Sequence, residues 1–214
     1  MVQNYQNIFN SKIDLMKDQQ SIFKVEKSEN WIVEKEILGK KVLELLYKSG
    51  AIKTWYRDKK DGWILNSGLW SPVYISLRPI SSIKNCSELL SCIGLSLSKL
   101  IINEIPKFSK ILGLATTGIQ IATAISIYYV ANKSNKNVKV NDVVVLIDRE
   151  QGAKEIAESH EINLHSLIPF KSKLYWLKDK FSPIEYKVIN EYLSNYSNFQ
   201  NQEKINNIKK LSKN

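Results

Sequence analysis

The stretch VVLIDREQGAKE (residues 144–155) decides the fold, because an apolar run passes through a charged turn into a helical segment. Residues 142–147 have the nearly continuous apolar character of a strand buried on both faces. A helix over residues 153–160 and a second strand over residues 163–168 follow directly. Because a strand, a helix and a strand in this order are typical of a parallel sheet, we predict an α/β protein.

Further elements are predicted on both sides of this unit. Helical spacing of apolar residues is found at 31–46, 87–105, 119–129 and from residue 182 onward, and a short buried strand at 110–115. The segment AIKTWYRDKKDGWIL (residues 51–65) predicts a β-hairpin around a Lys-Lys-Asp-Gly turn. We expect one domain over residues 31–194, a helical N-terminal extension over 1–30 and a polar C-terminal tail over 195–214.

Composition narrows the class of protein. The chain has 214 residues, of which 43% are hydrophobic and 24% charged, and this excludes wholesale disorder. A polar N-terminus and the lack of a long apolar stretch predict a cytoplasmic protein with no membrane partner. Cys86 and Cys92 lie far along the chain from His160 and His165, so we expect two reduced thiols rather than a metal site or a disulfide.

The charge leaves two interpretations open. Lys and Arg number 31 against 21 Asp and Glu, which gives a net charge of +10. Such an excess favours anionic partners, namely RNA, DNA, a ribonucleoprotein or a phosphorylated small molecule. The alternative is a general bias of composition, because the chain is rich in Lys, Asn and Ile and has no basic block.

Two loops at the ends of predicted strands are candidate sites. Thr116, Thr117 and Gly118 follow the strand at 110–115 and begin a helix, where backbone N–H groups can hold a phosphate. The alternative is that one of these threonines simply caps the helix. Arg149 follows the strand at 142–147. Its guanidinium could clamp a carboxylate, or it could pair with a neighbouring acid and organise the turn.

Three motifs together resemble one enzyme family. SGLWSPVYISLR (67–78), LATTGIQIATAI (114–125) and VVLIDREQGAKE (144–155) are similar, in this order, to motifs of orotate phosphoribosyltransferases. These enzymes join orotate to phosphoribosyl pyrophosphate (PRPP) in pyrimidine (UMP) biosynthesis. The resemblance covers about residues 31–192. It implies a reduced phosphoribosyltransferase-type, Rossmann-like parallel sheet with flanking helices, a small hood region and helical terminal extensions.

The resemblance also implies roles for individual residues. Ser67, Gly68 and Tyr74 would lie in the hood over the substrate, and Arg149 would bind the carboxylate of orotate. The pyrophosphate loop would comprise Thr116, Thr117 and Gly118. The resemblance implies no permanent cofactor, with Mg²⁺ entering only together with PRPP, and it makes a homodimer an expectation.

The centre of the chain departs from the family. The family has there a loop lysine and a PRPP signature containing two acids, whereas residues 119–143 contain a single acid, Asp142. Asn66 also stands where the family has a lysine. We therefore expect a core shortened between 127 and 141, assign no catalytic residue, and predict a catalytically impaired relative or pseudoenzyme that binds orotate or a pyrimidine nucleotide.

Two other functions are kept as alternatives. The first is a basic scaffold recruited to RNA, DNA or a macromolecular complex. The second is an active enzyme that converts orotate and PRPP to orotidine 5′-phosphate and pyrophosphate, which would apply if the sequence shown lacks part of its centre. Whether the chain is an enzyme is thus left open by the sequence.

Overall fold

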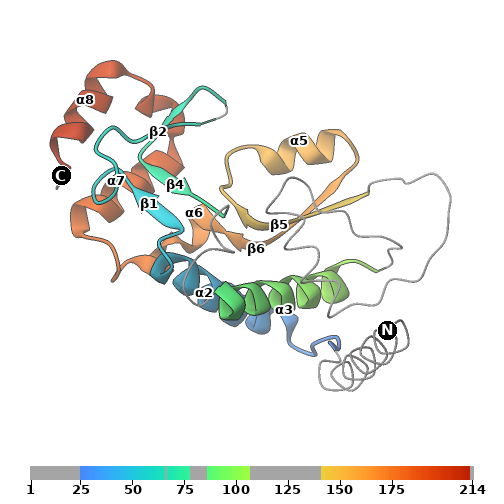
Figure 1. Cartoon of the computed structure of the whole chain (residues 1–214). Helices are drawn as coiled ribbons and strands as arrows, with labels where there is room; N and C mark the ends of the chain where they lie inside the picture. The colour runs from blue at the N-terminus through green and yellow to red at the C-terminus, as the bar shows by residue number, and fades with distance from the viewer. Residues whose placement is uncertain (1–24, 66, 78–85, 107–140, 213–214) are drawn as a thin grey trace, which may run out of the picture.

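Figure 1 shows the chain as a computed structural model, which describes residues 25–65, 67–77, 86–106 and 141–212. The parallel strands β5 (Asp142–Asp148) and β6 (Asn163–Pro169) form the centre, joined through α5 (Ala153–Ser159). Helices α2 (Trp31–Lys48) and α3 (Cys86–Glu104) cover one face of these strands, and α5 lies on the other (Figure 1). The predicted α/β class with a parallel sheet and flanking helices is confirmed.

The register of the parallel pair is regular. Asp142 lies opposite Asn163 at one end, and Asp148 lies opposite Pro169 at the other. Leu146 is buried on this pair, where it joins the apolar faces of α2 and α3 in the core. The strand and helix bounds follow the sequence pattern within two residues, because each element carries its own apolar period.

Helix α2 ends where the sequence predicts. Its inward stripe includes Val42, Leu43 and Leu46, all fully buried. The helix stops at Ser49, and Gly50 then adopts a left-handed φ of 72°. Such a φ costs glycine little, so the Ser-Gly pair turns the chain towards the first strand.

Four short strands form a small hood beside the parallel pair. They are β1 (Ile52–Thr54), β2 (Trp63–Ile64), β3 (Trp70–Ser71) and β4 (Val73–Ile75). Strand β1 pairs antiparallel with β4, and β2 pairs antiparallel with β3.

The predicted hairpin within residues 51–65 is therefore wrong, because β1 and β2 do not pair with each other. The chain turns immediately after β1, where Asp58 donates its N–H to the Thr54 carbonyl at 2.9 Å and accepts the Thr54 N–H at 2.8 Å. Gly62 then approaches Trp70 and the Ser71 carbonyl so closely that a Cβ would lie 2.8 Å from them. This close approach holds β2 beside β3, so β2 pairs with β3 rather than with β1.

The C-terminal part is helical. It contains α6 (Phe170–Lys173), the 3-10 helix η2 (Leu174–Leu177), α7 (Pro183–Ser194), the 3-10 helix η3 (Tyr196–Phe199) and α8 (Gln202–Lys210). Trp55 of the hood donates its Nε1–H to the Ile208 carbonyl at 2.9 Å. Helices α7 and α8 thus lie against the hood, at the upper left of Figure 1. The domain boundaries at 30/31 and 194/195 remain predictions.

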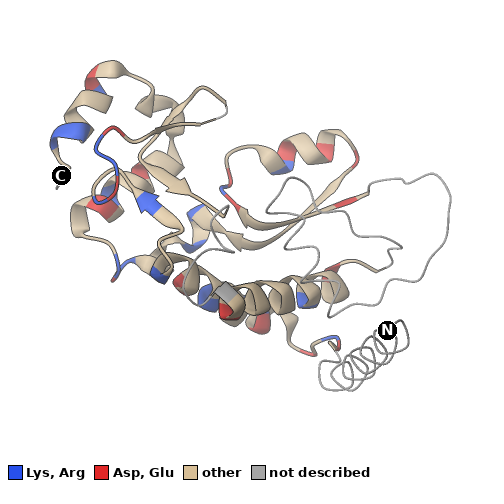
Figure 2. Cartoon of the chain, in the orientation of Figure 1, with Lys and Arg blue, Asp and Glu red and all other residues tan. Residues whose placement is uncertain are grey.

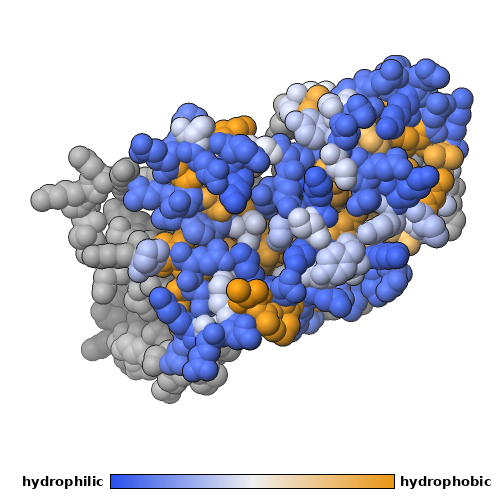
Figure 3. All heavy atoms as spheres, turned by 180° about the vertical axis from the view of Figure 1, so that it is seen from behind, coloured by the Kyte–Doolittle hydropathy of each residue, from blue (hydrophilic) through white to orange (hydrophobic). Residues whose placement is uncertain are grey.

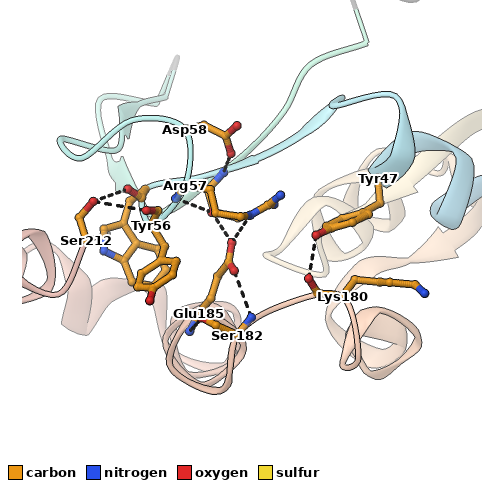
Figure 4. Close-up of polar contacts among 10 residues, drawn as sticks. Tyr47, Tyr56, Arg57, Asp58, Lys180, Ser182, Glu185 and Ser212 are labelled. Atoms are coloured by element: carbon orange, nitrogen blue, oxygen red, sulfur yellow. Dashed lines mark hydrogen bonds and ion pairs between the residues drawn. The ribbon is translucent and has the colours of Figure 1, made fainter. Parts of the chain in front are cut away.

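Helix α7 is also fastened to the hood through its first turn. Ser182 caps the helix in a reciprocal arrangement with Glu185. Glu185 is 1% exposed and accepts hydrogen bonds from the Thr54 hydroxyl and from Arg57 Nε, the latter at 2.7 Å. Figure 4 shows these contacts, together with the Tyr47 hydroxyl donating to the Lys180 carbonyl.

Several predicted features lie outside the described residues. They are the strand at 110–115, the helix at 119–129, the threonine-glycine loop between them and nearly all of the shortened centre. No helix in the described ranges is long and apolar enough to cross a membrane. Figure 3 shows a largely hydrophilic surface on the face behind Figure 1, interrupted by apolar patches. Helix α2 contributes three exposed apolar residues, Ile32, Val33 and Ile37.

Candidate ligand-binding site

The loop that follows β5 is held in an unusual backbone conformation. Asp148 Oδ1 accepts the Glu150 N–H at 2.8 Å, which tightens the turn directly after the strand. Glu150 has a φ of 57° and Gly152 a φ of 98°, both in the left-handed region. A non-glycine residue is seldom found at such a φ without surrounding contacts that hold it there.

Those contacts come from α6. Glu150 accepts the Ser172 N–H at 2.7 Å and the Ser172 hydroxyl at 2.6 Å, so both of its carboxylate oxygens are occupied. Each acid that flanks Arg149 therefore bonds elsewhere: Asp148 to the loop backbone and Glu150 to α6. The loop is anchored on both sides of the arginine.

Arg149 reaches from this loop to two other parts of the fold. Its Nη2 donates to the Ser71 hydroxyl on β3 and to the Tyr192 hydroxyl on α7, each at 3.2 Å. The guanidinium carbon lies 5.7 Å from the centroid of the Tyr192 ring. The side chain thus lies where the end of the parallel pair, the hood and a C-terminal helix meet.

Two buried donors of the loop have no hydrogen-bond partner within the described ranges. They are Arg149 Nε and Gln151 Nε2. Arg149 also forms no ion pair with a described residue, so the alternative that it pairs with Asp148 or Glu150 is wrong. A partly buried cation without a counter-charge is costly, and so is a buried donor without an acceptor. The arrangement is suited to an anionic, acceptor-rich group.

The other predicted site residues have different positions. Ser67 and Gly68 lie at the exposed tip of the turn between β2 and β3, where Gly68 adopts a φ of 78°. Tyr74 stacks on Trp63 with ring centroids 5.7 Å apart and planes at 16°. Nothing in the described part of the chain joins these three residues to Arg149, so their contact with a ligand remains a prediction. Thr116, Thr117 and Gly118 lie outside the described residues.

Sequence reasoning missed Ser71, Gln151 and Tyr192. Ser71 stands in the same motif as Ser67, and Gln151 in the same loop as Arg149, so both carried a local signal. Tyr192 carried none, because it is one more apolar-face residue of a helix 43 positions beyond Arg149.

A second polar cluster lies at the opposite end of the parallel pair. His165 stands between two carboxylates, with Nδ1 3.1 Å from Glu104 Oε2 and Nε2 2.9 Å from Asp142 Oδ1. Burial raises the pKa of Glu104, but hydrogen bonds from Lys35, Trp31 and His165 outweigh it and hold that pKa below its usual value.

The described residues do not form a metal site here, because no three or more of their His, Cys, Asp and Glu side chains are arranged to hold an ion. Both ring nitrogens of His165 have partners within the cluster, in contrast to the unpartnered Nε of Arg149. We therefore take the loop after β5, with Arg149, as the candidate ligand-binding site.

Comparison with known proteins supports the α/β fold described above. No protein-family model matches the chain. The solved UMP synthase of Leishmania donovani superposes with a TM-score of 0.59 at 17% identity, covering 73% of this chain and 42% of that one. The orotate phosphoribosyltransferase of Francisella tularensis gives 0.54 at 18% identity, covering 71% and 96%. The chain has an orotate phosphoribosyltransferase-like fold.

The two matches differ in extent. The chain matches less than half the length of the UMP synthase and nearly the whole length of the Francisella enzyme. At these identities the likeness concerns the fold, while the chemistry must be argued from the site.

Proposed function

We propose that the chain binds orotate or a pyrimidine nucleotide carrying the same carboxylate, and that Arg149 is the residue that receives this carboxylate. The observation that carries the proposal is the guanidinium of Arg149, partly buried and without a carboxylate partner in the described residues. The likeness in fold to orotate phosphoribosyltransferases supports the choice of ligand.

The chemistry of the two groups is complementary. A guanidinium carries five N–H donors in a planar fork that matches the two oxygens of a carboxylate. Ser71 and Tyr192 offer neutral hydroxyl oxygens, which accept hydrogen bonds but leave the positive charge uncompensated. A planar ligand with a carboxylate on its ring would supply that charge.

We further propose that the chain does not transfer phosphoribose efficiently. Residues 119–143 contain one acid, whereas the family's PRPP signature has two. That acid, Asp142, starts β5 and bonds to Asn163 and His165, at the end of the strand opposite to Arg149. Loss of one preorganised electrostatic contact typically removes about 3 kcal/mol of transition-state stabilisation.

Calorimetry with the full chain tests the binding proposal. We expect orotate and orotidine 5′-phosphate to bind, and Arg149→Ala to abolish the measured heat. Arg149→Lys should weaken binding, because an ammonium cannot form the bidentate contact. Lys154→Ala is the matched control, since it removes an exposed positive charge from the helix after the loop. Absence of heat with both ligands in the wild-type chain would refute the proposal.

A turnover assay tests the loss of transfer separately. Purified chain is mixed with orotate, PRPP and Mg²⁺, and release of pyrophosphate is followed. We expect no turnover above background under conditions in which orotate binds. Measurable pyrophosphate release would instead favour an active enzyme.

Nucleic-acid binding is the alternative with the weaker support. Figure 2 shows Lys and Arg interleaved with Asp and Glu along α2, α3 and α5. Several lysines are used in ion pairs: Lys35 with Glu104, Lys99 with Glu34, and Lys173 with Glu36. A gel shift at low salt that weakens steeply as salt is added would favour this alternative. The cytoplasmic location and the homodimer remain predictions.

A further inference from the structure

The hydroxyl of Tyr192 is placed deep in the fold, next to the candidate site. Tyr192 is 1% exposed on α7, and its ring packs edge-on against Phe199 with centroids 5.4 Å apart. A buried tyrosine hydroxyl nearly always needs a hydrogen-bond partner. Here the partner is Arg149, whose Nη2 donates to it at 3.2 Å.

Two neutral oxygens therefore hold one end of the guanidinium. Ser71 and Tyr192 both accept from Nη2, and the Tyr192 ring lies 5.7 Å from the guanidinium carbon. Two acceptors on one terminal nitrogen fix both the direction and the plane of the fork. Because neither acceptor is charged, they orient the cation without neutralising it, and no described residue accepts a hydrogen bond from the remaining donors.

The supporting side chain is itself held rigidly. Helix α7, which carries Tyr192, starts at the capping box of Ser182 and Glu185, and Glu185 is bonded to Arg57 and Thr54 beneath the hood. The hydroxyl of Tyr192 is therefore a fixed point rather than a surface group that adapts to its neighbours.

We infer that Tyr192 is a positioning residue for Arg149, which sets the orientation in which the guanidinium meets the carboxylate of the ligand. The inference rests on the proposed function, because it assumes that Arg149 binds this carboxylate. It makes α7, which the sequence motifs do not include, a determinant of carboxylate recognition.

The test removes the hydroxyl and keeps the ring. We expect Tyr192→Phe in the full chain to weaken orotate binding about tenfold, since a hydrogen bond to a charged group is lost. Binding of uracil, the same ring without the carboxylate, should be unchanged. Tyr186→Phe is the matched control on the same helix, because its hydroxyl makes no hydrogen bond with the described residues. Calorimetry gives the affinities, and circular dichroism checks the fold.

Each outcome has a defined meaning. Wild-type chain that binds no orotate overturns the proposed function together with this inference. Wild-type chain that binds orotate, with Tyr192→Phe binding it equally well, overturns the inference alone. Equal weakening of orotate and uracil would show a merely structural role and also overturns it. If uracil binding is too weak to measure, the orotate affinities of Tyr192→Phe and Tyr186→Phe decide. If Tyr192→Phe fails to fold, Ser71→Ala removes the other hydroxyl acceptor of Nη2. A selective loss of orotate affinity is then expected, and unchanged orotate affinity would overturn the inference that these hydroxyls orient the guanidinium.

Discussion

Arg57→Ala should destabilise the chain strongly, because Arg57 fastens the hood to α7. Its Nε lies 2.7 Å from Glu185 Oε1 (Figure 4). Its guanidinium carbon lies 5.0 Å and 5.7 Å from the ring centroids of Tyr47 and Phe181. Removal of Arg57 would leave a carboxylate that is 1% exposed without its cation. The Thr54 hydroxyl would remain as a partner of that carboxylate.

The expected magnitude follows from these contacts. Breaking a buried ion pair by removing one partner costs about 3–5 kcal/mol. The side chain of Arg57 is 33% exposed, so water can enter and the lower end of that range applies. We therefore expect the free energy of unfolding to fall by about 3 kcal/mol. For a chain of this size each kcal/mol lowers Tm by about 2–4 °C, so Tm should fall by about 6–12 °C.

Urea unfolding of a double-mutant cycle measures this interaction. The cycle comprises Arg57→Ala, Glu185→Gln and the double variant, and we expect a coupling of about 1–3 kcal/mol. Lys154→Ala is the control, because its exposed pair with Glu158 at 3.9 Å should contribute less than about 0.5 kcal/mol. Strict additivity of the two single variants, or a loss below about 1 kcal/mol for Arg57→Ala, would refute the reasoning.

Three further results are expected. Because the pKa of Glu104 is lowered in the folded chain, its carboxylate stabilises the fold above about pH 4.3, and this stabilisation is lost as pH falls through the folded pKa. Urea unfolding midpoints measured from about pH 6 to about pH 3 should therefore fall less steeply in Glu104→Gln than in the wild-type chain. Gly62→Ala should lower the free energy of unfolding by about 3 kcal/mol, and Gly50→Ala by about 1 kcal/mol. Of these two positions, only at Gly62 would a Cβ meet a carbonyl oxygen and an indole ring at 2.8 Å. Equal urea midpoints for the two variants would contradict this. Burial raises the pKa of the Cys92 thiol, so in a Cys86→Ser chain iodoacetamide should alkylate it slowly at about pH 7 until denaturant is added, as intact mass reports.

The parallel pair could be predicted from sequence because its signals are local. Strands β5 and β6 each carry an apolar run, and the turn at Gly152 separates the first of them from α5. The position of Arg149 at the end of β5 followed from the same pattern. These features depend on neighbouring residues, which a sequence displays directly.

The hood and the surroundings of Arg149 depend on distant residues instead. Strand β1 pairs with β4 about twenty positions later, and both strands are too short for their sequences to indicate which strand they pair with. Tyr192 contacts Arg149 only because α7 folds back over the end of β5. Long-range pairing of this kind is decided by packing and leaves no periodic signal.

The contacts of Trp55 with α8 bear on how the chain folds during synthesis. Its indole bonds to Ile208, and its carbonyl accepts from the Ser212 hydroxyl, across 153 and 157 residues. The core around this tryptophan therefore cannot close until α8 has left the ribosome. The β5–α5–β6 unit has no such requirement and can form as soon as it emerges. We expect the hood to fold after this unit, exposing apolar surface to chaperones until α8 has emerged.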